Sequence, residues 1–237
     1  MKRNLKTTKK NKSIILLSGG LDSLVSLGLA KEELNIELAL TFDYGQRTAK
    51  KEIEASKRIA EHYSISHNVI KLDWLAQITD TALVNTNKDL PSPGASNLDN
   101  LELAEKSARG VWVPNRNGVF LNIAAAYADS MGFTHIIFGA NKEEAATFPD
   151  NSEAFIEKIN AAFEYSTLVK PIVVAPLAAY TKTETVKLAI KHNVPLNLLR
   201  SCYTDEEIHC GECESCLRLK RALTEVFGSE LPVKFKA

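Results

Sequence analysis

The feature that most constrains this chain is a short apolar run that ends directly in a glycine-rich turn. Ile14–Leu17 has the length of a buried strand, and Ser18–Ser23 (SGGLDS) follows it and opens a helical pattern over Leu21–Leu34. Consecutive glycines let backbone N–H groups converge on an anion, and the helix N-terminus adds partial positive charge at the same place. The pattern predicts a cradle for phosphate or pyrophosphate, formed by Leu17, Ser18, Gly19, Gly20, Leu21, Asp22 and Ser23.

This turn carries an acid where a Walker A loop carries a lysine. There is no lysine between Ser18 and Ala30, so the segment is not a Walker A loop. A carboxylate beside a polyphosphate would be repelled, and we therefore predict that Asp22 binds Mg²⁺ together with ATP. The positive charge must come from other segments, and the candidates are Arg47, Arg116, Lys142 and Lys182. The competing interpretation is a tight strand-to-helix turn that Asp22 only caps.

The rest of the chain alternates between short apolar runs and longer helical patterns. Further strands are predicted at 36–42, 68–72, 135–139 and 171–175, and helices at 50–63, 118–131, 151–165, 181–192 and 214–227. This alternation predicts an α/β fold, a doubly wound parallel sheet covered by helices on both faces. In such sheets ligands bind beyond the carboxyl ends of the strands.

Local signals refine the element boundaries. Asp150 or Asn151 is expected to cap the helix at 151–165, and Thr181 with Glu184 forms a capping box. Residues 85–100 are polar and contain two prolines and one glycine, so a long loop is predicted there.

Charge is distributed unevenly along the chain. Residues 1–12 hold six of the 29 basic residues and no acid, and we expect them to form a disordered basic tail. They lack the apolar stretch of a signal peptide, and no apolar run reaches the roughly 20 residues of a membrane span. We therefore predict a cytoplasmic protein, with an α/β domain at 13–200 and a metal-binding segment at 201–237 packed on it.

Four cysteines lie within fifteen positions. In the series Cys202, Cys210, Cys213 and Cys216, two Cys-x-x-Cys steps share one cysteine. Four thiolates close a tetrahedral site, so the spacing predicts a structural zinc ion without an open coordination position. An iron–sulfur cluster, a site in which His209 replaces one cysteine, and a redox Cys-x-x-Cys pair are the alternatives.

A zinc-dependent nucleic-acid-binding module is the alternative from another functional class. It would need a basic face around the cysteines, whereas residues 202–216 hold five acidic residues and no lysine or arginine. The chain beyond residue 12 also has more acidic than basic residues, 29 against 23. Nucleic acid is therefore not the expected partner.

With these motifs in this order, the chain resembles the QueC family of 7-cyano-7-deazaguanine synthases, which belongs to the N-type ATP pyrophosphatases. The pyrophosphate loop is shared across that superfamily, and the cysteine cluster is more discriminating. The other matching segments are 42–47, 113–117, 120–122, 139–141, 148–150, 155–156, 176–177 with Lys182, 201–203 and Arg218. The chain departs from the usual bacterial pattern at 144–151 and at Asn115, which stands where glycine is usual.

The resemblance implies a Rossmann-like fold and an ATP-dependent ligase. Its substrates would be 7-carboxy-7-deazaguanine and ammonia, and its product a nitrile that feeds queuosine or archaeosine formation. One ATP would adenylate the carboxylate and a second the resulting amide. The resemblance also suggests a homodimer. An amide synthetase that stops after one ATP and a tRNA thiolase are the alternatives within the superfamily.

The resemblance also assigns roles to individual residues. Asp22, Arg116 and Lys182 are expected to be catalytic, and Asp43 is expected to bind ATP with the loop. The expected substrate-binding residues are Arg47, Asn117, Asn141 and Asp150. Simpler interpretations exist for four of them: Asp43 in a turn, Arg47 paired with Glu52 or Glu54, and Asn117 and Asp150 as helix caps.

Overall fold

Alternating side chains of one central strand enter two separate hydrophobic cores. The computed structural model describes residues 10–236. In β1 (Lys12–Leu16), Ile15 contacts the core on one face of the sheet, and Ile14 and Leu16 contact the core on the other. A strand buried on both faces is apolar at consecutive positions, and this explains why the run beginning at Ile14 lacks polar residues.

The sheet has five strands, and every strand pairing in the described residues is parallel. Their order is β3-β2-β1-β4-β5. The strands after β1 are β2 (Asn35–Asp43), β3 (Ser66–Lys71), β4 (His135–Ile137) and β5 (Ile172–Val174). The chain adds β2 and β3 on one side of β1 and then crosses to the other side. The strand order therefore reverses between β1 and β4, where such sheets bind ligands.

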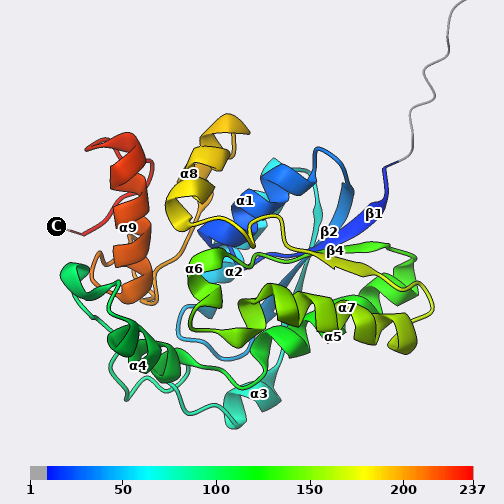
Figure 1. Ribbon diagram of the computed structural model, residues 1–237, viewed down its shortest axis with the longest axis horizontal. Coiled ribbons are helices and arrows are strands. Elements are labelled where there is room, and N and C mark those ends of the chain that lie inside the picture. Colours follow the sequence, from blue (N-terminus) through cyan, green and yellow to red (C-terminus); the bar gives the residue numbers. More distant parts are fainter. Residues whose placement is uncertain (1–9, 237) are drawn as a thin grey trace, which may run out of the picture.

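Helices cover both faces of the sheet (Figure 1). One core contains residues of α1 (Leu21–Ala30), α2 (Ala49–His62), α8 (Lys182–Lys191) and α9 (Glu214–Phe227). The other contains residues of α5 (Arg116–Met131) and α7 (Glu153–Ser166). This arrangement confirms the predicted doubly wound α/β fold. The shorter elements are α3 (Asp73–Gln77), α4 (Leu101–Val111), α6 (Lys142–Ala145) and the 3₁₀ turns Ala95–Asn97, Pro149–Asn151 and Leu196–Leu198.

Most predicted elements are present, with shifted boundaries. The capping box of α8 is confirmed, since Thr181 Oγ1 accepts from the Glu184 N–H at 3.2 Å and the Glu184 carboxylate accepts from the Thr181 N–H at 2.8 Å. Helix α1 ends at Ala30, four residues before the predicted end. Helix α4 was not predicted, and it follows the predicted loop at 85–100 directly.

The predicted cap of α7 is wrong. Ser152 is the N-cap, and its Oγ accepts a hydrogen bond from the Phe155 N–H at 3.1 Å. Asp150 and Asn151 instead lie in a 3₁₀ turn that Pro149 opens. Both are buried, and this places the Asp150 carboxyl toward the interior and away from the end of the helix.

The ends of the described chain bear on the predicted division into domains. Residues 1–9 of the predicted tail lie outside the described residues, and Lys12 begins β1. At the other end, Leu219 and Leu223 of α9 share a core with α1 and α8, so this helix, which begins within the cysteine-containing segment, packs on the helices of one face of the sheet.

Among residues 10–236, none of the helices has both the length and the apolar character needed to cross a membrane.

Candidate active site

The pyrophosphate loop is packed so closely that only glycine fits at two positions. Gly19 has φ +81°, and a Cβ atom there would lie 2.9 Å from Ala55 Cβ. A Cβ atom on Gly139, just after β4, would lie 2.9 Å from Ser23 N. Side chains at either position would push the loop away from α2 or separate α1 from the end of β4.

A cavity of about 260 Å³ lies at the carboxyl ends of β1, β2 and β4. The predicted site residues that line it are Leu17, Ser18, Gly20, Leu21, Asp22, Ser23, Arg116, Asn117, Asp150 and Lys182. Four others, Gly19, Asp43, Arg47 and Asn141, do not line it. Of the four candidate basic residues, Arg116 from α5 and Lys182 from α8 therefore line the same cavity as the loop.

Lys182 lies between two carboxylates beside the loop. Its Nζ is 2.9 Å from Asp22 Oδ2 and 2.9 Å from Glu144 Oε1. Burial opposes the charge of Lys182, but the two acids outweigh it and raise the pKa of Lys182 above its ordinary value. The amine therefore remains protonated at neutral pH. It can supply positive charge to a phosphate, and it cannot act as a base.

The pKa values of Asp22 and Glu144 shift in opposite directions. Burial raises the pKa of Asp22 and outweighs the opposing charge of Lys182. Burial also acts on Glu144, but there Lys182 prevails and the pKa falls below its ordinary value. Asp22 Oδ1 is buried and has no hydrogen-bond partner in residues 10–236. An oxygen in this state fits a cation ligand, since a bound cation would compensate its lost hydration.

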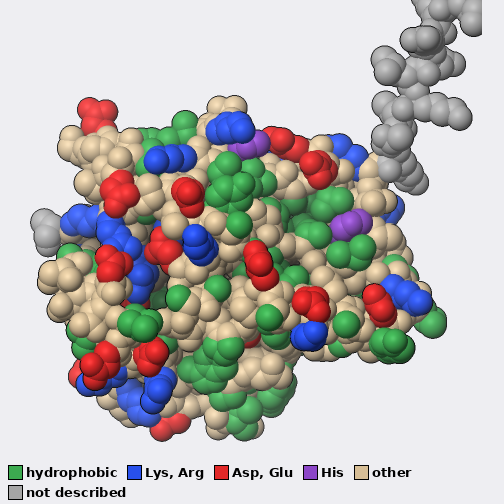
Figure 2. All heavy atoms as spheres, viewed as in Figure 1, with side chains coloured by type: hydrophobic (Ala, Val, Ile, Leu, Met, Phe, Trp, Pro, Cys, Tyr) green, Lys and Arg blue, Asp and Glu red, His purple; other side chains and the backbone are tan. Residues whose placement is uncertain are grey.

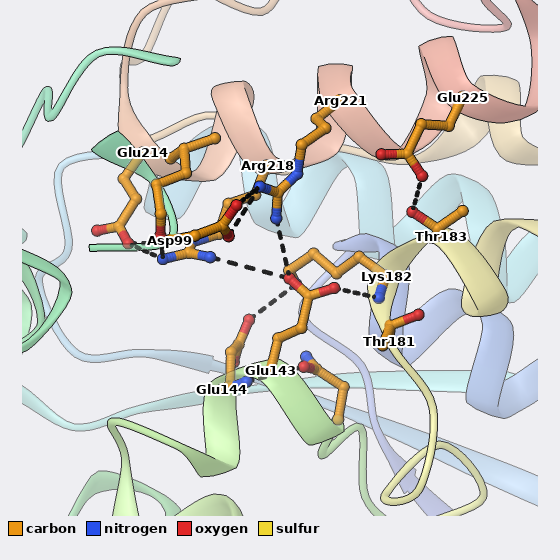
Figure 3. Close-up of polar contacts among 12 residues, drawn as sticks. Asp99, Glu143, Glu144, Thr181, Lys182, Thr183, Glu214, Arg218, Arg221 and Glu225 are labelled. Carbon is orange, nitrogen blue, oxygen red and sulfur yellow. Dashed lines mark hydrogen bonds and ion pairs between the residues drawn. The ribbon is translucent and has the colours of Figure 1, made fainter. Parts of the chain in front are cut away.

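Helix α6 delivers Glu144 to the site and is fixed at its start (Figure 3). Asn141 is fully buried, and its side-chain oxygen accepts a hydrogen bond from the Glu144 N–H at 2.9 Å. The neighbouring Glu143 accepts a hydrogen bond from the Lys182 N–H at 2.7 Å and faces Arg218 at 3.8 Å. Asn141 therefore affects the cavity through Glu144 and does not line it.

Arg116 enters the cavity from the first turn of α5. Its Nη1 donates to Tyr44 Oη at 3.3 Å. Asn115 precedes it with φ +50°, a left-handed conformation that non-glycine residues rarely adopt. Asp150 lies nearby and is 9% exposed; burial raises its pKa, while the charge of Arg116 lowers it in part. Asn117, 5% exposed, completes this wall.

Two predicted site residues make backbone contacts outside the cavity. Arg47 Nη2 donates to the carbonyl oxygens of Asn85 and Lys88 at 2.8 and 2.9 Å, and so anchors the start of the loop at 85–100. Its predicted alternative partners, Glu52 and Glu54, form no ion pair with it among the described residues. Asp43 accepts a hydrogen bond from the Gly45 N–H at 3.1 Å, as in a turn that ends a strand.

The four cysteines form a group that can hold a metal ion. Their sulfur atoms all lie within 4.8 Å of one another. Backbone N–H groups point at the sulfurs, from Cys210 to Cys202 Sγ at 3.3 Å and from Cys213 to Cys210 Sγ at 3.3 Å. Such hydrogen bonds stabilise thiolates. His209 is not part of this group. Its Nε2 accepts a hydrogen bond from the Ser201 N–H at 3.2 Å.

Comparison with known proteins places the chain in a family. Residues 12–227 match the model of the family described as queuosine biosynthesis protein QueC. The chain belongs to the QueC family. The match spans both the pyrophosphate loop and the cysteine group.

Relatives named 7-cyano-7-deazaguanine synthase are similar to this QueC-family chain over nearly its whole length. One from Methanosarcina mazei is 50% identical over 218 residues, which are 91% of this chain and 94% of the relative. Another from Desulforamulus reducens is 48% identical over 223 residues, 94% and 97% of the two chains. The U34-tRNA thiolase NcsA from Methanococcus maripaludis, solved with its 4Fe–4S cluster, has a similar fold. Its TM-score is 0.50 at 16% identity, with 94% of this chain and 75% of the thiolase covered.

Sequence reasoning missed several residues that line the cavity of this QueC-family chain. Glu144 could have been found, because it stands in the segment where the chain departs from the bacterial pattern. Trp112 and Phe148 also line the cavity, and their rings lie nearly parallel with centroids 6.1 Å apart. Phe148 stands in a segment that matches the family, whereas Trp112 carried no signal beyond its aromatic side chain. Polar or aromatic lining residues that were likewise assigned no role include Tyr44, Gln46, Arg200, Ser201, Tyr203, Glu214, Ser215 and Arg218.

Proposed function

We propose that the chain converts 7-carboxy-7-deazaguanine and ammonia to 7-cyano-7-deazaguanine with ATP. Membership of the QueC family and the names of its relatives support this reaction. The observation that carries the proposal is the position of Asp22. Its Oδ1, which has no hydrogen-bond partner among the described residues, lies at the start of α1 beside the loop, and its other oxygen, Oδ2, accepts from Lys182 Nζ at 2.9 Å. This is the arrangement required to bind a magnesium-bound polyphosphate.

The proposed chemistry first makes the carboxylate reactive. A carboxylate oxygen attacks the α-phosphorus of ATP, pyrophosphate leaves, and an acyl-adenylate results. Ammonia then attacks the acyl carbon, and AMP leaves with the original carboxylate oxygen to give the amide. The amide oxygen attacks a second ATP in the same way. Loss of AMP and two protons leaves the nitrile, so two ATP are consumed for each product.

The loop and the two buried cations supply the electrostatic part of this chemistry. Developing negative charge on the leaving pyrophosphate is stabilised by preorganised donors, here the loop N–H groups with Ser18 and Ser23. Mg²⁺, when bound with ATP, would be held by Asp22 and would neutralise phosphate charge. Lys182 provides a fixed positive charge at the loop. Arg116 has the planar donor set that binds a carboxylate or an α-phosphate through two parallel hydrogen bonds.

We assign substrate recognition to the part of the cavity that Asp150 and Asn117 line beside Arg116. Asp150 and Asn117 line the cavity and can bind the guanine-like edge through hydrogen bonds. Asn141 is proposed to position Glu144, and Arg47 to hold the loop that begins near Asn85. Asp43 shapes the turn after β2 and is proposed to support nucleotide binding from there.

For the cysteine group we propose one structural zinc ion. In a tetrahedral site with Zn–S bonds of about 2.3 Å, sulfur atoms lie about 3.8 Å apart, and Cys210 Sγ and Cys216 Sγ are 3.8 Å apart. A cubane cluster would hold its thiolates farther from one another, because four iron atoms lie between them.

We also propose a cytoplasmic enzyme that works as a homodimer. Nucleic acid is not a proposed partner, since acidic and basic side chains are interspersed on the face drawn in Figure 2.

Product analysis tests the proposal. Incubation with 7-carboxy-7-deazaguanine, ammonium and MgATP is expected to give the nitrile by mass spectrometry, with two AMP released per nitrile. Accumulation of the amide with one AMP would identify an amide synthetase instead. Absence of AMP release with this substrate would contradict the proposed substrate.

A further inference from the structure

The two residues that precede the cysteine group lie against the pyrophosphate loop. The Arg200 N–H donates to the Gly19 carbonyl at 2.7 Å. The Leu21 N–H, at the start of α1, donates to Ser201 Oγ at 3.4 Å. Both ends of the glycine turn are therefore in contact with a segment that leads directly into Cys202.

Ser201 is itself held by residues of the cysteine segment. Ser215 Oγ donates to the Ser201 carbonyl at 2.6 Å, and the Ser201 N–H donates to His209 Nε2 at 3.2 Å. Ser215 directly precedes Cys216 in the first turn of α9, and His209 directly precedes Cys210. His209 is 5% exposed, so packing also fixes its ring. Both hydrogen-bond partners of the Ser201 backbone thus lie next to a cysteine ligand.

Metal binding and the geometry of the loop are linked through these contacts. Four thiolates within 4.8 Å of one another are held together by a shared cation, and metal binding by such a group is coupled to the folding of its segment. Without the cation, His209 and Ser215 would leave their positions and Ser201 would lose both partners. We propose that the metal-loaded cysteine segment sets the position of the pyrophosphate loop, with Ser215 and His209 as positioning residues that act through Ser201. This rests on the proposed function, in which that loop binds ATP.

Coupling of this kind must act in both directions. If the loaded cysteine segment raises the affinity of the loop for nucleotide, bound nucleotide must raise the affinity for the metal by the same factor. Two hydrogen bonds carry the link, and their loss corresponds to a factor of roughly 5 to 150. Direct contact of Ser201 or Ser215 with a substrate would produce no such change in metal affinity.

The experiment titrates a chromophoric chelator into the Zn²⁺-loaded full chain, with and without α,β-methylene-ATP and Mg²⁺. The methylene group blocks cleavage between the α and β phosphates. We expect that, with the analogue bound, at least about five-fold more chelator is needed to remove half of the Zn²⁺ than without it. Ser215→Ala is expected to retain one Zn²⁺, to bind the analogue about five-fold more weakly, and to show a smaller effect of the analogue on chelation than the wild type, because one of the two linking hydrogen bonds is removed. Ser215→Thr, which keeps the hydroxyl, should restore both.

Ser92→Ala is the matched control. Ser92 Oγ also donates to a carbonyl of the cysteine segment, that of Glu212 at 2.9 Å, but on a side that does not contact the loop. It should behave as the wild type. Where Ser215→Ala fails to retain Zn²⁺, Ser201→Ala replaces it, because that side chain contacts the loop and not the cysteine segment.

The outcomes separate the inference from the function on which it rests. Zn²⁺-loaded wild type that does not bind the analogue would contradict the proposed function. Wild type that binds the analogue, with the same chelator midpoint in its presence and absence, would overturn the coupling and leave the function standing. Wild-type affinity for the analogue in both Ser215→Ala and Ser201→Ala would also overturn it.

Discussion

Replacing Lys182 by methionine gives the most direct test of the electrostatics at the loop. The change keeps the length and apolar stem of the side chain and removes the charge between Asp22 and Glu144. The Asp22 and Glu144 carboxylates, whose side chains are 16% and 35% exposed, would then lie near each other without a cation. Loss of one partner from a buried ion pair costs about 3–5 kcal/mol. Because the Glu144 side chain is 35% exposed, we expect the lower end, about 3 kcal/mol at pH 8.

The sign of the pH dependence follows from the same contacts. Without Lys182, burial and mutual repulsion raise the pKa of at least one carboxyl in the folded state above its unfolded value. A group of this kind stabilises the folded state when protonated, and that contribution is lost as the pH rises through the raised pKa. The destabilisation by Lys182→Met should therefore be smaller at pH 6 than at pH 8. One pKa unit corresponds to about 1.4 kcal/mol, so a difference of this order is expected.

Chemical denaturation by urea without Mg²⁺, followed by circular dichroism at both pH values, measures the effect. Lys142→Met is the matched control. Lys142 is exposed, it begins the helix α6 that carries Glu144, and it forms no ion pair within residues 10–236. It should cost less than about 0.5 kcal/mol. Added Mg²⁺ should recover part of the loss in Lys182→Met. An equal destabilisation at pH 6 and pH 8 would refute the assignment of the cost to the paired carboxylates.

Three further predictions concern the loop and the metal. Asp22→Ala should abolish AMP release from MgATP while circular dichroism shows a retained fold, and unchanged AMP release would remove Asp22 from the mechanism. Gly19→Ala should weaken binding of a non-cleavable ATP analogue at least ten-fold, measured by calorimetry, because its φ of +81° and the 2.9 Å approach to Ala55 leave no room for a methyl group. Cys213→Ser should lose bound zinc by elemental analysis and unfold at a lower temperature than the wild type; full zinc content in that variant would contradict the four-cysteine site.

The alternation of apolar runs was sufficient to predict the sheet, because the central strands are mostly apolar. The signal was weaker at the edge strand β3, which is largely polar. Boundaries were less predictable where three possible capping residues stood next to one another. Asp150, Asn151 and Ser152 are all good capping residues, and the choice fell to Ser152 because Pro149 opens a separate 3₁₀ turn before it. Helix α4 left a weak signal, because it buries little more than Ser107, Ala108 and Val111.

The site was predictable at the level of segments and less so at the level of side chains. Strand ends and helix starts placed the loop, Arg116 and Lys182 at one edge of the sheet. Side-chain direction does not follow from such spacing. Asp43, the last residue of β2, and Asn141, four residues after the end of β4, both accept hydrogen bonds from nearby backbone N–H groups. Glu144 was missed because its role depends on Lys182, which lies 38 residues away in the sequence.

Strand β1 is buried on both faces of the sheet, and this has a consequence for how the protein unfolds. Its backbone is bonded to β2 on one side and β4 on the other, and Ile14 and Ile15 are completely shielded from solvent. Amide protons in the middle of this strand can exchange with deuterium only when the whole domain unfolds. The glycine-rich turn follows β1 directly, so this edge of the cavity is attached to the slowest-exchanging part of the molecule.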